Sequence, residues 1–255
     1  MKTELTTAIE EFWTARQRGD FFPQAYFNRL TLDDAYRIQL GLIERRVAAG
    51  ERQIGWKVGL TAEVIQQQFA FHEPVFGCIL EAKPSGYVFK SAELLRPGFE
   101  TELCLRLAKQ LEGSASLGEV QDAIDSIYPS FEIIETRGDF STQAALGIAD
   151  NAQQRAVILG EAVQFRKDMD LSRVQSHVFI NGVEVAAGFG SAVLGDPLRS
   201  VTWLSAKLAQ YGRRLQAGDI VMTGSFVRQF PLSAGDSAAA DFSGIGRVEV
   251  FIAPA

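Results

Sequence analysis

Histidine and cysteine are scarce in this chain of 255 residues, which contains two of each: His72, His177, Cys78 and Cys104. No CxxC or HExxH motif occurs, so a zinc site built from sulfur and nitrogen ligands is not expected. Two cysteines that lie far apart fit a reducing compartment, in which both thiols pack in the core. We therefore expect a cytoplasmic protein.

Several other signals are missing. The chain has no GxxxxGK[ST] loop and no GxSxG elbow, and Val193 stands where a third glycine would complete a dinucleotide fingerprint after Gly188-Phe189-Gly190. No run approaches the roughly 18 consecutive apolar residues of a membrane span, and Met1–Asp20 has no apolar segment after a basic start, so no secretory signal is expected. Because 25 basic residues face 31 acidic ones, the basic footprint of a nucleic-acid-binding protein is absent too.

What is present indicates one globular domain over residues 1–255, since 47% of the residues are hydrophobic and 22% are charged. Apolar residues at helical spacing predict a helix around Leu5–Trp13, which Gly19 ends. A second helix is expected from Thr31, with Asp34 completing a capping box, to about Gly50. No linker follows, so residues 1–50 are predicted to form a helical layer on the same domain.

Residues 51–255 predict a β-rich core, because short apolar runs alternate with Gly, Pro and Asp. Asn181-Gly182 marks a two-residue hairpin turn within the run 177–187. Helices are expected at 117–127, stopped before Pro129, and at 198–211. The other strands are predicted at 54–60, 74–80, 99–108, 130–136, 219–223, 237–242 and 247–252. Because strands and helices do not alternate regularly, we expect an α+β fold on a mixed sheet.

Carboxylates, one lysine and the backbone remain as candidates for catalysis. In a strand over 99–108, Glu100 and Glu102 share one face. Two adjacent like charges repel, and a hard divalent cation such as Mg²⁺ or Mn²⁺ would offset them. The alternative is a solvated strand face with Arg106 as the local counter-charge.

Two further acids stand in the apolar run 131–137, which reads FEIIETR. A glutamate between apolar neighbours is expensive to bury unless it is paired or binds a metal. Glu132 and Glu135 lie on opposite faces of a strand, so at most one of them joins Glu100 and Glu102, and the period does not say which. Glu135 has an alternative role, which is to pair with Arg137 or lie exposed at the strand end.

Lys57 stands alone in the apolar run Ile54–Thr61, between two glycines. Burial there would lower its pKa and suit it to acid–base work. The alternative is that its ammonium group reaches the surface while the stem stays buried.

An ordered set of segments resembles one family. The segments that carry the resemblance are GWKVGLT at 55–61, EPVFG at 73–77, FETEL at 99–103, FEIIETR at 131–137, ADNA at 149–152, NGVEV at 181–185, LGDPL at 194–198 and AGDIVMTGSF at 217–226. From about Leu32 to Ile252 the chain resembles the 2-keto-4-pentenoate hydratase family, within the fumarylacetoacetate hydrolase-like superfamily. The resemblance implies a mixed β-roll core with helices packed outside.

The resemblance also implies a site. It selects Glu132 over Glu135, so that Glu100, Glu102 and Glu132 hold Mg²⁺ (or Mn²⁺), and it makes Lys57 the group that moves protons. The other implied site residues are Glu73 and Asp150, which orient water or the lysine, and Leu60, Thr61, Arg137, Ser225 and Phe226, which contact the substrate. Hydrogen bonds in caps and turns are the alternative role for Glu73 and Asp150, and pairing with Glu135 is the alternative for Arg137.

The implied reaction is metal-dependent addition of water to a 2-hydroxy-2,4-dienoate, giving a 4-hydroxy-2-oxo acid in aromatic meta-cleavage catabolism. The Gly224-Ser225-Phe226 loop tends to accompany hydratases. The alternatives are a 4-oxalocrotonate-type decarboxylase, an acylpyruvate hydrolase, and a non-catalytic partner subunit. A homo-oligomer is expected because β-rich folds of this size often pair through exposed strands, and a pathway partner enzyme is conceivable.

The chain departs from the family pattern at two places. The usual PRIEAE before the metal acids reads PGFETE at 97–102, so an arginine is missing where Gly98 or Phe99 stands, and DSR reads ETR at 135–137. Neither change removes a metal ligand. Both fall where the pocket is expected to read the far end of the substrate.

Overall fold

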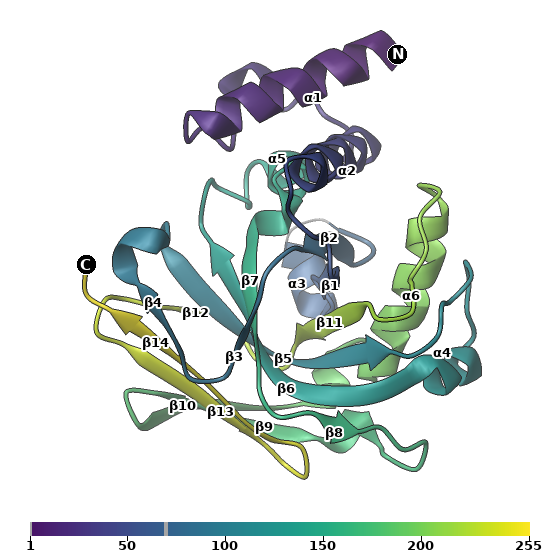
Figure 1. The fold of residues 1–255 in the computed structure, drawn as a ribbon, viewed down its shortest axis with the longest axis vertical. Coiled ribbons are helices and arrows are strands. Elements are labelled where there is room, and N and C mark those ends of the chain that lie inside the picture. The colour runs from purple at the N-terminus through teal and green to yellow at the C-terminus, as the bar shows by residue number, and fades with distance from the viewer. Residues whose placement is uncertain (1, 69–70) are drawn as a thin grey trace.

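The computed structural model describes residues 2–68 and 71–255, and over these residues it has two sheets and a helical layer (Figure 1). The larger sheet curls, and its strands lie in the order β2 (Val75–Ile79), β1 (Gly55–Gly59), β11 (Ile220–Ser225), β5 (Pro97–Leu107), β6 (Ile124–Glu135), β7 (Gln154–Leu159) and β3 (Ala82–Pro84), with β12 (Phe230–Pro231) beside β5 and β8 (Val163–Gln164) beside β6. The second sheet has the order β10 (Val183–Phe189), β9 (Gln175–Ile180), β13 (Ser237–Phe242), β14 (Gly246–Ala253) and β4 (Tyr87–Lys90). The predicted α+β fold with a β-rich core is confirmed.

Helices cover the outside of the larger sheet. They are α1 (Lys2–Gln17), α2 (Leu32–Ala48), α3 (Glu63–Gln68), α4 (Leu117–Ala123), α5 (Ala144–Ala149) and α6 (Pro197–Ala209). Figure 1 shows α1 at one end of the molecule, α2 packed between α1 and the sheet and beside α5, and α6 beside β11. Within the described ranges, none of these helices combines the length and apolar character that a membrane crossing requires.

The N-terminal layer is tied to the sheet by its buried residues. Thr31 and Asp34 form the predicted capping box at the start of α2. Further along α2, the amide of the fully buried Gln39 donates to the carbonyl of Phe76 on β2 (3.1 Å) and to that of Ile148 on α5 (2.7 Å). A hydrogen-bonded amide in an apolar surrounding fixes the orientation of its helix, because leaving it unpaired would be unfavourable. α2 therefore sets the position of both β2 and α5.

The strand pairing places the chemistry-bearing residues. β5 and β6 run antiparallel over their whole length, with Glu100 opposite Glu132. β11 pairs with β5 on its other side and with β1 in parallel, so that Lys57 lies opposite Met222. The Asn181-Gly182 turn joins β9 and β10 as predicted, and both residues have the positive φ (51° and 78°) that a primed turn requires.

The helix expected at 117–127 is wrong in its second half. α4 ends at Ala123, and Ile124 already has extended backbone angles as the first residue of β6. Apolar residues at 120, 123, 124 and 127 fit a helical period, but Ile124 and Ile127 face a core that β5 completes. Pro129 is tolerated inside β6 because it falls between the stretches that pair with β8 and β7, and its carbonyl accepts the Gly160 N–H (2.8 Å).

Gly55 lies where β1 enters between β2 and β11, and it has no room for a side chain. A Cβ there would stand 1.9 Å from the carbonyl oxygen of Ile220. We expect Gly55→Ala to lower the free energy of unfolding by at least about 2 kcal/mol, because the strand backbone itself would have to shift. Urea unfolding measures this loss. Gly118→Ala in α4, where a Cβ meets nothing within 4 Å, is the matched control and is expected to be neutral or stabilising.

Candidate functional site

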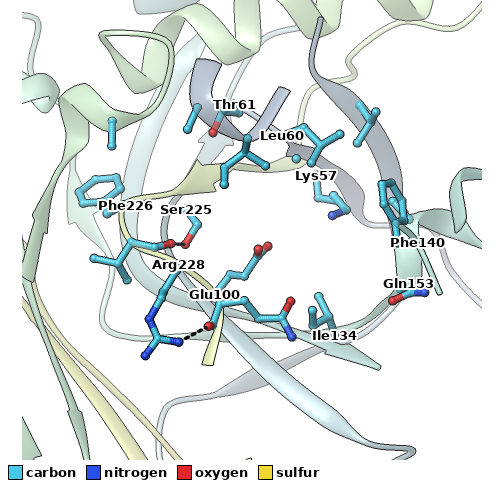
Figure 2. A pocket seen from close by; sticks show the side chains of 18 of the residues that line it. Lys57, Leu60, Thr61, Glu100, Ile134, Phe140, Gln153, Ser225, Phe226 and Arg228 are labelled. Carbon is cyan, nitrogen blue, oxygen red and sulfur yellow. Dashed lines mark hydrogen bonds between the residues drawn. The ribbon is translucent and has the colours of Figure 1, made fainter. Parts of the chain in front are cut away.

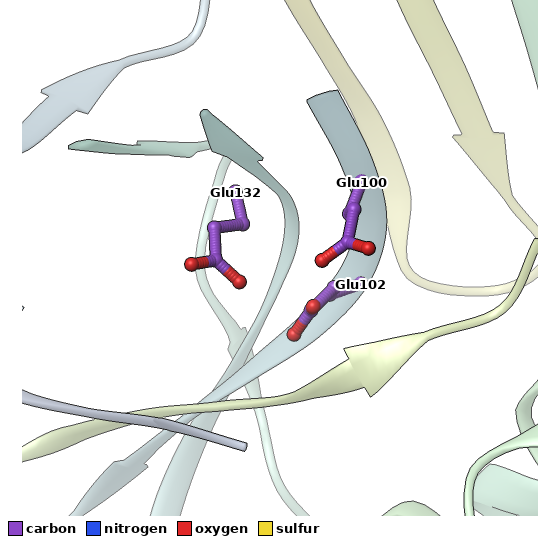
Figure 3. Close-up of side chains that lie close together, drawn as sticks. All are labelled: Glu100, Glu102 and Glu132. Carbon is purple, nitrogen blue, oxygen red and sulfur yellow. The ribbon is translucent and has the colours of Figure 1, made fainter. Parts of the chain in front are cut away.

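Three carboxylates meet where β5 and β6 cross the middle of the larger sheet (Figure 3). Glu100 and Glu102 lie two residues apart on β5, so their side chains share a face, and Glu132 comes from the opposite position on β6. One oxygen from each lies within 4.8 Å of the others. Glu102 and Glu132 are fully buried, so the expected alternative of a solvated strand face is wrong. Arg106 does not reach this cluster and instead donates to the hydroxyl of Tyr128.

The cluster has more lone pairs than the protein satisfies. Glu102 Oε2 accepts the backbone N–H of Gly224 (2.8 Å). Its Oε1 and both oxygens of Glu132 are buried without a hydrogen-bond partner among the described residues. Lys57 Nζ stands 3.3 Å from Glu132 Oε1, close enough for an ion pair. Buried carboxylate oxygens that lack donors are a set that fits Mg²⁺ or another hard divalent cation.

The same crowding shifts the ionisation of the cluster. Burial raises the pKa of Glu102 well above its ordinary value, and the charges of Glu132 and Glu100 add to the rise. Burial also raises the pKa of Glu132, to about 7, although Lys57 opposes the rise. For the polypeptide alone, burial lowers the pKa of Lys57 but the three carboxylates outweigh it, so its pKa is raised. The lowered pKa suggested by its apolar strand is therefore not what these neighbours produce. With 4% exposure, Lys57 does not reach the surface either.

A pocket of about 510 Å³ opens beside the cluster, and Lys57 and Glu100 point into it (Figure 2). Four residues named from the sequence as substrate contacts line it: Leu60, Thr61, Ser225 and Phe226. Ser225 is held by its neighbours, since its hydroxyl donates to the carbonyl of Val227 (2.7 Å) and accepts the Thr101 N–H (3.2 Å). The structure thus gathers these four beside the carboxylates, and their contacts with a substrate stay predictions.

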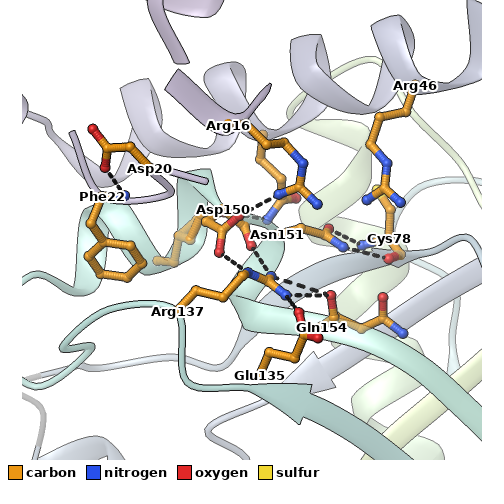
Figure 4. Close-up of polar contacts among 12 residues, drawn as sticks. Arg16, Asp20, Phe22, Arg46, Cys78, Glu135, Arg137, Asp150, Asn151 and Gln154 are labelled. Atoms are coloured by element: carbon orange, nitrogen blue, oxygen red, sulfur yellow. Dashed lines mark hydrogen bonds and ion pairs between the residues drawn. The ribbon is translucent and has the colours of Figure 1, made fainter. Parts of the chain in front are cut away.

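Arg137 and Asp150 lie elsewhere, in a buried ionic network that Figure 4 shows. The Arg137 guanidinium binds Asp150 Oδ2 (2.5 Å) and Glu135 Oε2 (2.9 Å), while Arg16 from α1 binds Asp150 Oδ1 (2.7 Å). The alternative pairing of Arg137 with Glu135 is therefore present. Neither Arg137 nor Asp150 is among the described residues that line the pocket.

The network nonetheless adjoins the pocket through the next three residues. Asn151, Ala152 and Gln153 all have positive φ values (59°, 48° and 60°), which is unfavourable for side-chain-bearing residues. Asn151 holds this turn against β2 by accepting the Cys78 N–H (2.7 Å) and donating to the Cys78 carbonyl (2.8 Å). Ala152 and Gln153 then form part of the pocket wall. No role was predicted for these two residues, although Ala152 belongs to the quoted ADNA segment and Gln153 follows it.

Glu73 also lies away from the pocket-lining residues. Its carboxylate pairs with Lys207 Nζ (2.6 Å) and accepts a hydrogen bond from the indole of Trp203 (3.4 Å), both on α6. Several wall residues, among them Ile134 and Phe140, were not found from the sequence, because no short pattern marks a residue that reaches a pocket from a distant element. Neither His72 nor His177 is among the described lining residues.

Comparisons with known proteins point to one family. Residues 64–253 match the family model described as fumarylacetoacetate (FAA) hydrolase C-terminal. The chain is 31% identical to a 2-keto-4-pentenoate hydratase of Paraburkholderia xenovorans (strain LB400) over 252 residues, which covers 94% of this chain and 92% of that protein. It is 32% identical over 232 residues to a 2-oxo-hept-4-ene-1,7-dioate hydratase of Escherichia coli, covering 87% of each.

Solved structures agree as well. The structure of a 4-oxalocrotonate decarboxylase from Pseudomonas putida G7, complexed with magnesium and adipate, superposes with a TM-score of 0.91 at 29% identity, covering 99% of this chain and 98% of that one. The family model matches most of the chain, and relatives with about 31% identity cover nearly its full length, so family membership is established. The chain belongs to the fumarylacetoacetate hydrolase C-terminal family.

Proposed function

We propose that the protein is a metal-dependent hydratase that adds water to a 2-hydroxy-2,4-dienoate and gives a 4-hydroxy-2-oxo acid in aromatic catabolism. The observation that carries the proposal is the buried carboxylate cluster, with oxygens that lack partners, at the wall of a pocket that also holds Lys57. The similarity to hydratases supports this reaction.

Glu100, Glu102 and Glu132 would hold Mg²⁺ or Mn²⁺, since all three offer oxygen ligands. When bound, such an ion supplies a Lewis acid for the C1 carboxylate and C2 oxygen of a 2-oxo acid and stabilises negative charge on the C2 oxygen. Glu102 is oriented for this role by the Gly224 N–H, which occupies its other oxygen.

Lys57 Nζ is the group we assign to proton transfer, because it borders both the carboxylates and the pocket. It would pass the proton of the dienol hydroxyl to C5, and then pass to C3 the proton that water loses as its oxygen adds at C4, so that the lysine ends in its starting protonation state. Leu60 and Phe226 would enclose the diene, and Thr61 would present its hydroxyl group to the substrate. Ser225, whose hydroxyl donates to the carbonyl of Val227, would contact the substrate by shaping the wall.

Glu73, Asp150 and Arg137 are proposed as positioning residues, since none of them is among the described residues that line the pocket. Asp150 and Arg137 would act through the turn 151–153, which forms part of the wall. Glu73 would act by fixing the segment before β2 against α6.

A decarboxylase of the 4-oxalocrotonate type is the second candidate. The similarity in structure to such an enzyme favours it, and the same carboxylates and lysine would serve it. An acylpyruvate hydrolase of the branch that uses a histidine base is less well supported, because neither histidine is among the described lining residues.

Turnover of 2-hydroxypenta-2,4-dienoate tests the proposed reaction directly. We expect loss of its ultraviolet absorbance with Mg²⁺, formation of 4-hydroxy-2-oxopentanoate, and no turnover after EDTA treatment until the metal is restored. Product identification by mass spectrometry separates hydration from simple ketonisation. If the metal-loaded enzyme does not turn over this dienoate but releases CO₂ from 4-oxalocrotonate, the decarboxylase assignment replaces the hydratase assignment.

Glu102→Gln tests the metal centre without reference to activity. Removing the charge of Glu102, a buried carboxylate that two neighbouring carboxylates repel, is expected to raise the thermal midpoint of the metal-free protein. In the wild type, Mg²⁺ at a hundredfold excess over its Kd is expected to add about 3 kcal/mol to the free energy of unfolding, and the variant should lose most of this gain. Glu135→Gln, on the opposite face of β6, is the control and should keep the full response to Mg²⁺. An unchanged response in Glu102→Gln would contradict the assigned ligand set.

Lys57→Met removes the proposed proton carrier and keeps a long side chain. We expect kcat to fall about 10²–10⁴-fold, while magnesium binding is kept or tightened, because a cation beside the carboxylates is gone. Steady-state kinetics and calorimetric titration of Mg²⁺ measure the two effects separately. Lys83→Met, at a lysine paired with Glu81 outside the pocket, should leave both unchanged. Wild-type kcat in Lys57→Met would assign proton transfer to another group.

A further inference from the structure

The pocket changes character with distance from the carboxylates. Lys57 and Glu100 mark its polar end, whereas most of the remaining wall is apolar. Six residues that form this apolar wall are Leu60, Val64, Ile65, Ile134, Phe140 and Val227. A cavity of about 510 Å³ is in the range that holds drug-sized ligands, so a five-carbon acid would leave part of this wall uncovered.

Positive charge is sparse along the described wall of the cavity. Among the described residues that line it, Lys57 and Arg228 are the cations. Lys57 is engaged by the carboxylate cluster. Arg228 is an exposed residue whose guanidinium lies over the Phe230 ring (4.1 Å to its centre) and donates to the carbonyl of Gln229 (3.4 Å), as the dashed line in Figure 2 shows.

Two neutral donors on the wall are also occupied. The amide of Gln153 donates to the carbonyl of Gly138 (2.9 Å), and the hydroxyl of Ser225 donates to the carbonyl of Val227 (2.7 Å). A second carboxylate placed against the apolar part of this wall, away from Arg228, would lose its water and find no cation among the described residues. Burial of an unpaired charge is among the most unfavourable events in a binding site.

We infer that the substrate carries a single carboxylate and an uncharged, apolar tail, and that dicarboxylic dienoates are discriminated against. This inference rests on the proposed function, since the head group is the 2-oxo or 2-hydroxy acid bound beside Lys57. It goes further, because it assigns the far end of the substrate and favours a monoacid hydratase over decarboxylation of a diacid.

Binding of saturated 2-oxo acids to the full-length, Mg²⁺-loaded protein tests the tail without turnover. The matched ligands are 2-oxoadipate and 6-methyl-2-oxoheptanoate, in which an isopropyl group replaces the distal carboxylate. By calorimetry we expect the apolar ligand to bind at least about thirtyfold more tightly. Across 2-oxopentanoate, 2-oxohexanoate and 2-oxoheptanoate, affinity should rise about fourfold per methylene as each is buried.

Two variants identify which residues read the tail. Val64→Arg places a cation at an exposed position on the rim of the apolar wall. It should improve 2-oxoadipate binding and so reduce the ratio of the affinity for 6-methyl-2-oxoheptanoate to that for 2-oxoadipate. Val64→Gln, which is neutral and polar, should leave this affinity ratio unchanged. Arg228→Gln should also leave the affinity ratio of the two ligands unchanged, because the inference assigns Arg228 no contact with the tail.

Three outcomes overturn the inference: 2-oxoadipate binding as tightly as its apolar partner, loss of 2-oxoadipate affinity in Arg228→Gln, or no binding of any 2-oxo acid. The proposed function is judged separately, by turnover of 2-hydroxypenta-2,4-dienoate. An enzyme that hydrates this dienoate yet prefers diacid ligands would keep the function and lose the tail assignment.

Discussion

Mutual repulsion among three clustered carboxylates, two of them fully buried, is the constraint around which this protein is arranged. The β5–β6 register makes the repulsion unavoidable, because it sets Glu100 opposite Glu132 with Glu102 beside them. Against three negative groups the protein supplies one ammonium, that of Lys57, and one backbone N–H, that of Gly224. The pKa values of Glu102 and Glu132 rise in response, first because of burial. A site that stores unfavourable charge in this way is primed to bind a divalent cation.

Keeping these like charges close together requires a rigid backbone around them. The backbone segments beside the pocket are accordingly held in constrained conformations. Gly224 has a φ of 117° and no room for a side chain, since a Cβ there would stand 2.4 Å from the hydroxyl oxygen of Thr61. The turn 151–153 has three consecutive positive φ values. These strained segments persist because buried polar contacts hold them, above all the Arg137–Asp150 ion pair that Arg16 extends to α1. The N-terminal helices thus support the pocket wall from outside it.

Sequence patterns correctly predicted the features that depend on interactions between residues close together in the chain. The period-two spacing of Glu100 and Glu102, the capping box at Thr31 and the turn at Asn181 each depend on neighbours a few residues away. For Arg137 the sequence left open substrate binding or pairing with the local Glu135, and it did not predict the ion pair with Asp150, which lies just before a strained turn. The end of α4 was misplaced because pairing with β5 overrode a helical period. The resemblance supplied Glu132, whereas wall residues such as Phe140 reach the pocket from elements that no short pattern connects.

The departure from PRIEAE to PGFETE gains a physical meaning in the structure. Gly98 lies two residues before Glu100 on β5, hence on the same face, and a Cβ there would stand 2.5 Å from the amide nitrogen of Gln229. Where the resemblance leads one to expect an arginine, this chain therefore packs a neutral amide. Phe99, on the opposite face, stacks with the ring of Phe230 and meets that of Phe131 edge to face (5.8 and 4.8 Å between ring centres). The chain therefore carries no guanidinium at 98 or 99, and the aromatic contact of Phe99 lies on the face of β5 opposite Glu100, outside the described lining of the pocket.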